Sequence, residues 1–86
     1  MKDILIAITG AELDFEMARS MARIIARQEN SETDCLAWSD ARQGRQSPSS
    51  VQCEIKGRPD WEVYGENHGG RRKIVFNGGE YVFIHS

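Results

Sequence analysis

A short polar segment near the middle of the chain carries the residue types that recognise anions. Asp40, Arg42 and Arg45 lie in the segment 39–50, directly after a predicted strand. Guanidinium groups bind phosphate and carboxylate through paired N–H donors, and ligands of α/β units gather at the carboxyl ends of parallel strands. A helix that starts at Thr9–Gly10 would bring further N–H donors to the same edge. These residues are candidates for binding a small anionic ligand, although a solvated loop with surface arginines is the favoured interpretation.

Glu66 and His68 form a second pair, in the glycine-flanked segment 65–72. Imidazole titrates near neutral pH, so a carboxylate two residues away is a candidate partner in general acid–base catalysis. Arg71, in the same segment, is a further candidate for binding an anion. Polar residues are expected in a turn in any case, and the segment offers neither a nucleophile nor a third orienting group. The sequence therefore offers Glu66 and His68 for catalysis but favours a protein that is not an enzyme.

The cysteines and histidines are of the types that bind zinc, but their spacing does not fit a zinc motif. Cys35 and Cys53 are far apart, and neither has His68 or His85 at a short interval. The glycine-rich fingerprints of nucleotide-binding proteins are also absent from the sequence. We therefore predict no metal and no cofactor. Whether the two cysteines form a disulfide stays open, although thiols are the rule in a reducing compartment.

Several aromatic residues with nearby arginines suggest a third kind of site. Single-stranded nucleic acids stack their bases on aromatic side chains within a basic groove. The net charge of −2 argues against a strongly basic face, and aromatic residues of a small domain commonly form its core. Nucleic-acid binding is therefore the last of the functions that we consider. The candidates are Trp38, Trp61, Tyr64 and Tyr81, with Arg58, Arg71 and Arg72.

The length and composition of the chain limit where these residues can act. A chain of 86 residues, 40% hydrophobic and 28% charged, forms one domain, which we place at residues 1–86. The longest uncharged runs, residues 4–11 and 46–53, are far shorter than the roughly 20 residues of a transmembrane helix. The first residues lack the pattern of a signal peptide. The sequence predicts a cytoplasmic protein that makes no membrane contact.

The first half of the chain predicts a strand, a long helix and a second strand. Residues 2–9 are apolar on both faces, which is typical of a central strand. Thr9 and Glu12 have the spacing of a capping box, which predicts a helix over residues 10–28. A second strand at residues 35–38 would then run parallel to the first.

The second half alternates in the manner of an antiparallel sheet. We expect strands at residues 51–55 and 61–64 and a hairpin from 72–77 and 80–85. A loop at Gly78–Gly79 sets Phe76 opposite Tyr81 and pairs apolar residues on both faces. The predicted fold class is α+β in the order β-α-β-β-β-β. One long N-terminal helix packs on a mixed, mostly antiparallel sheet of four to five strands.

Two apolar surfaces exceed what this arrangement can cover. The helix is apolar over more than the arc of about 100° that one sheet covers, and the hairpin is apolar on both faces. A monomer would leave more apolar surface in water than monomers usually do. We therefore predict a homodimer. The interface candidates are Leu13, Met17 and Ile24 on the helix, or Val75, Val82 and Ile84 on the hairpin.

The second half of the chain contains several short motifs: Leu36-Ala37-Trp38-Ser39-Asp40, Ser47-Pro48, Pro59-Asp60-Trp61 with Tyr64, Gly69-Gly70, and the run from Gly79 to Ile84. Together they resemble a small prokaryotic α+β domain family of uncharacterised function, over residues 33–86. The resemblance implies an α+β fold and supplies no catalytic residues. Our leading interpretation is a small non-catalytic binding or interaction module that forms a homodimer. The alternative is an anion-binding protein or an acid–base enzyme that uses the 39–50 and 65–72 loops.

Overall fold

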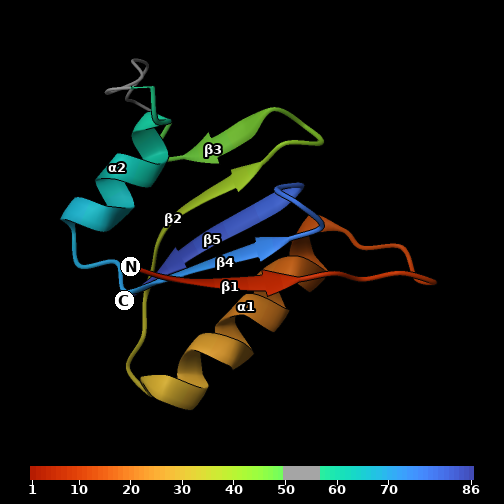
Figure 1. Ribbon diagram of the computed structural model, residues 1–86, viewed down its shortest axis with the longest axis horizontal. Helices are drawn as coiled ribbons and strands as arrows, with labels where there is room; N and C mark the ends of the chain where they lie inside the picture. Colours follow the sequence, from red (N-terminus) through yellow and green to blue (C-terminus); the bar gives the residue numbers. More distant parts are fainter. Residues whose placement is uncertain (50–56) are drawn as a thin grey trace.

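The computed structural model describes residues 1–49 and 57–86. It contains a five-stranded mixed sheet with one helix on each face (Figure 1). The strand order in the sheet is β1-β4-β5-β2-β3. In chain order the elements are β1 (Lys2–Ile6), α1 (Phe15–Glu29), β2 (Cys35–Asp40), β3 (Arg45–Ser47), α2 (Asp60–Asn67), β4 (Arg72–Phe76) and β5 (Tyr81–His85). The fold class α+β is confirmed, whereas the single-helix order is wrong, because a second helix precedes the hairpin.

Strand β1 lies at the edge of the sheet, and the expectation of a central first strand is wrong. It pairs in parallel with β4, and β4 and β5 separate it from β2, which runs parallel to it as expected. Ile4 and Ile6 pack under α1, while Leu5, on the opposite face, is 76% exposed. The two-faced apolar pattern therefore reflects one buried face and one exposed face rather than burial on both sides.

The C-terminal hairpin has the expected register. Phe76 pairs with Tyr81, Val75 with Val82, and Ile74 with Phe83. Gly78 and Gly79 both have positive φ, 72° and 117°, which glycine adopts without the strain of a side chain. The pairing of apolar residues on both faces therefore predicted the register correctly.

Helix α1 begins five residues later than the capping-box prediction. Asp14 is the N-cap and its carboxylate accepts from the backbone N–H of Met17 at 2.8 Å. Gly10 has a φ of +82°, outside the helical region, so the chain bends there and no helix starts at Thr9. The face of α1 toward the sheet has only a methyl group at every fourth residue, at Ala18, Ala22 and Ala26, all fully buried. These small residues let the helix approach the aromatic core of the sheet closely.

Residues 61–64, expected as a strand, belong to helix α2. Trp61 and Gly65, one helical turn apart, are buried against the sheet. A side-chain carbon at Gly65 would lie 2.9 Å from Cγ2 of Ile84, so only glycine allows this approach. On the outer side of the helix, Arg58 pairs with Glu62 at 2.9 Å and with Glu66 at 2.5 Å. Arg58, Glu62 and Glu66 are four residues apart, which is the spacing of neighbours on a helix. This spacing identifies the helix better than the short alternation that predicted a strand.

Helix α2 covers the face of the hairpin that carries Val82 and Ile84, for which the predicted fold had no covering element. Val82 and Ile84 are buried there with Ala37 and Trp61, and Leu13 is buried in the core beneath α1. These three interface candidates, Leu13, Val82 and Ile84, are therefore corrected to core residues. Of the other three, Val75 is half-buried, while Met17 and Ile24 are 45% and 62% exposed.

The segment 39–50, expected without regular structure, starts with a hairpin. β2 extends to Asp40, and β3 pairs with it in antiparallel register. The predicted strand 51–55 and Cys53 lie outside the described residues. Within the part of the chain that the structure describes, no helix has the length and apolar composition to cross a membrane.

Candidate functional site

Asp40 and Arg45, predicted to bind an anion, instead bind each other. The Asp40 side chain is 1% exposed, and its carboxylate accepts from Nη2 of Arg45 at 3.1 Å and from the backbone N–H of Gln43 at 3.1 Å. The Arg45 guanidinium lies 5.6 Å from the centre of the Phe15 ring. This cluster closes the β2–β3 turn against the start of α1.

Arg42 also has partners within the fold. Its Nη1 donates to the carbonyl oxygen of Leu13 at 3.2 Å, and its Nε lies 3.8 Å from Glu80. The expectation that this loop and the start of the helix share one edge is therefore correct. The backbone N–H of Met17 at that helix start, however, donates to the carboxylate of Asp14, so an anion would meet a negative charge there.

Glu66 and His68 do not pair in the structure. The Glu66 carboxylate binds Arg58, whereas Nδ1 of His68 donates to the carbonyl oxygen of Tyr64 at 2.8 Å. The His68 ring stacks on the Tyr64 ring with 3.9 Å between centres. His68 thus caps the C-terminus of α2 instead of forming an acid–base pair. Arg71, the third candidate of this segment, is exposed, and its backbone N–H donates to the carbonyl oxygen of His85.

The aromatic residues do not form a common platform. Trp61 and Tyr81 are buried on opposite faces of the sheet, and the Phe15 and Trp38 rings pack against each other. Of the potential metal ligands, Cys35 and His85 lie opposite each other on β2 and β5, while His68 lies at the end of α2. Among the described residues, no three His, Cys, Asp or Glu side chains cluster as metal ligands.

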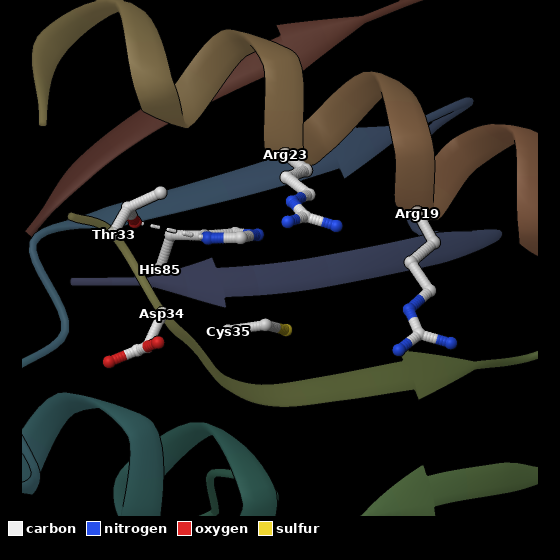
Figure 2. A pocket seen from close by; sticks show the side chains of 6 residues that line it. All are labelled: Arg19, Arg23, Thr33, Asp34, Cys35 and His85. Carbon is white, nitrogen blue, oxygen red and sulfur yellow. Dashed lines mark hydrogen bonds between the residues drawn. The ribbon is translucent and has the colours of Figure 1, made fainter. Parts of the chain in front are cut away.

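A polar pocket of about 200 Å³ opens between α1 and the far end of the sheet (Figure 2). Arg19 and Arg23 project from α1 toward the sheet, and His85 and Cys35 rise from the paired ends of β5 and β2. Two arginines therefore share a small space with a single carboxylate. The lining residues are Arg19, Arg23, Thr33, Asp34, Cys35 and His85.

His85 is the most buried residue of this pocket, with 3% of its surface exposed. Its Nδ1 lies 3.2 Å from the hydroxyl of Thr33, and that hydroxyl donates to the main-chain oxygen of Ser86 at 2.7 Å. Burial lowers the pKa of His85 below 6.5, and the charges of Arg72 and Arg23 lower it further against an opposing effect of Asp34. The imidazole is therefore neutral at pH 7.

Cys35 is exposed and its thiol stays protonated. Partial burial raises the thiol pKa above 9.0, against small opposing effects of a hydrogen bond to Ala37 and the charge of Arg19. The sulfur lies 3.6 Å from the carbonyl oxygen of Ala37. A neutral thiol is a weak nucleophile, so the pocket suits binding better than covalent chemistry.

The sequence carries one signal for this pocket. Arg19 and Arg23 are one helical turn apart on the polar side of the helix. His85 follows Tyr81 and Phe83 in alternation, so it belongs to the face of the hairpin under the helix. A histidine on a core face beside two arginines of the covering helix indicates a polar pocket.

Comparisons with known proteins place the chain in a family. The crystal structure of AF1514, described as a novel protein from Archeoglobus fulgidus, is similar over 100% of this chain and 93% of its own. The two share 28% sequence identity with a TM-score of 0.83. No curated protein matched the sequence. The resemblance to an uncharacterised α+β family is confirmed over a longer stretch than the sequence motifs covered. With residues 1–85 matching its profile, the chain belongs to DUF5619, a domain of unknown function.

Proposed function

We propose that this protein is a small, non-catalytic binding module whose pocket holds an anionic ligand through Arg19 and Arg23. The observation that carries the proposal is the charge of the pocket: two guanidinium groups face a neutral imidazole and a single carboxylate. Arg19 lies 3.8 Å from Glu16 across an exposed surface, a contact worth little. An anion in the pocket would therefore form stronger ion pairs with these arginines than the exposed Arg19–Glu16 contact that it would replace.

The volume of the pocket limits the size of the ligand. About 200 Å³ is below the usual range of roughly 300–1,000 Å³ for drug-sized ligands. It suits a small oxyanion with a few water molecules, or the charged end of a larger molecule. The neutral thiol is a weak nucleophile, which supports binding rather than a nucleophilic reaction.

Calorimetric titration with inorganic phosphate at constant ionic strength tests this function. Replacing Arg19 and Arg23 together with Gln should abolish binding. Arg27→Gln, one turn further along the same helix and outside the pocket, is the matched control and should bind as the wild type does. Equal loss in the control, or unchanged binding in the double variant, would contradict the proposal.

Self-association is a second candidate, supported by a separate observation. Leu5 on the edge strand β1 is 76% exposed and lies beside an apolar hollow of about 190 Å³ that Ala7 and Val75 also line. We propose that a second copy of the chain covers this surface. The anion site does not depend on it, because the pocket lies at the other end of the sheet, next to β2 and β5.

A further inference from the structure

The hydroxyl of Thr33 fixes which nitrogen of His85 carries the proton. The main-chain oxygen of Ser86 only accepts, and it receives N–H groups from Asn30 and Arg72 as well as the Thr33 hydroxyl. Because that hydroxyl has a single proton, its oxygen must accept from Nδ1 of His85. In the neutral imidazole, Nε2 then carries only a lone pair.

That lone pair faces the pocket. Figure 2 shows the ring edge away from Thr33 directed beneath Arg23, above Cys35. Among the described residues no hydrogen bond is formed to Nε2, and because no buried side-chain nitrogen lacks a partner there, Nε2 is open to the pocket although only 3% of His85 is exposed. The pocket therefore presents donors from two arginines and one acceptor from His85.

We infer that the pocket selects an oxyanion that carries its own hydroxyl proton, such as hydrogen phosphate, with its charged oxygens toward Arg19 and Arg23 and its hydroxyl donating to Nε2 of His85. The inference rests on the proposed function and deepens it by naming the ligand class. Sulfate has the same shape and a similar charge but brings no proton at neutral pH. It would leave Nε2 without a partner, and an unpaired buried acceptor weakens binding by about fivefold or more.

Burial first, and then the charges around His85, keep Nε2 in its accepting form at neutral pH. Arg19 and Arg23 face it from α1 and Arg72 from β4, while Asp34 and the neutral Cys35 face it from the start of β2. Two of these cations, Arg23 and Arg72, oppose protonation of the ring, and Asp34 alone favours it. At acidic pH the protonated ring would donate from Nε2, and sulfate would then bind as well as phosphate.

The test compares phosphate and sulfate by calorimetry with the wild-type protein at constant ionic strength, at pH 7.5 and at a pH below the His85 titration midpoint measured by NMR. We expect phosphate to bind at least about fivefold more tightly at pH 7.5, with the preference lost at the lower pH. Equal affinities at pH 7.5 would overturn the inference and leave the proposed function standing. Binding of neither anion would overturn the proposed function itself.

A variant and a spectroscopic measurement examine the role of Thr33 directly. Thr33→Val removes the acceptor for Nδ1–H, so the ring can carry its proton on Nε2, and the preference for phosphate should fall. Nitrogen NMR shifts of the wild-type His85 ring should report a proton on Nδ1 in the free protein. A proton on Nε2 would overturn the inference even if the variant failed to fold.

Discussion

The carboxylate of Glu29 joins the end of α1 to two strands. It accepts from Nζ of Lys2 on β1 at 2.9 Å and from Nε of Arg72 on β4. The hydrogen bond from Lys2, then that from Arg72, lowers the Glu29 pKa from 4.5 to about 2. Because this pKa is lower in the folded state, the ion pairs contribute stability above pH 4.5, and the contribution is lost as the pH falls toward 2.

We expect Glu29→Gln to be less stable than the wild type at pH 7, with the difference vanishing near pH 2. Urea unfolding across this range measures it, and Glu32→Gln, an exposed neighbour beyond the helix, is the control. A difference that stayed constant with pH would show that Glu29 acts through packing or helix propensity instead of its charge.

Only some residues of the candidate site could be predicted from the sequence. The sequence suggested an anion site at Asp40, Arg42 and Arg45, but the charges of these residues are used within the fold. Which arginine is paired internally depends on contacts between segments far apart in the chain, such as Arg42 with Leu13. The alternation that puts His85 on the core face is local, so that part could be predicted.

At the scale of elements, the start of α1 depends on Asp14 rather than Thr9. Asp14→Ala should lower the free energy of unfolding by about 0.5–2 kcal/mol, because it removes the acceptor for the backbone N–H of Met17. Thr9→Ala should leave it unchanged. Denaturant midpoints with an unchanged slope measure both, and the reverse order of effects would mean that the helix begins earlier in solution.

The hairpin register and the α+β class followed from the sequence because both depend on neighbouring residues. The position of β1 did not, because an apolar residue on an edge strand is indistinguishable in sequence from one in a central strand. Helix α2 was missed because its inward face is built from Trp61 and Gly65. Glycine counts as a turn residue in a pattern, yet here it permits close contact with Ile84.

At the scale of the whole molecule, two helices cover most of the apolar surface whose excess suggested a dimer. α1 covers one face of the sheet and α2 covers β2 and β5 on the other (Figure 1). On the α2 face of the described residues, the β1 side stays exposed, where Leu5 lies beside Val75 and Ala7. Met17 and Ile24 are exposed on α1, on a different side of the molecule from Leu5.

A second copy placed along β1 would cover the exposed apolar group and extend the sheet at its edge. An edge strand presents main-chain groups that pair readily with another strand, and a twofold axis beside β1 would bury Leu5 of both copies. Sedimentation equilibrium at micromolar concentration should then give twice the 9.7 kDa of the chain. Leu5→Glu should return it to a monomer, because it would bury an unpaired charge, whereas Ile24→Glu should stay dimeric. A wild-type monomer would contradict self-association, and dissociation by Ile24→Glu alone would move the interface to α1.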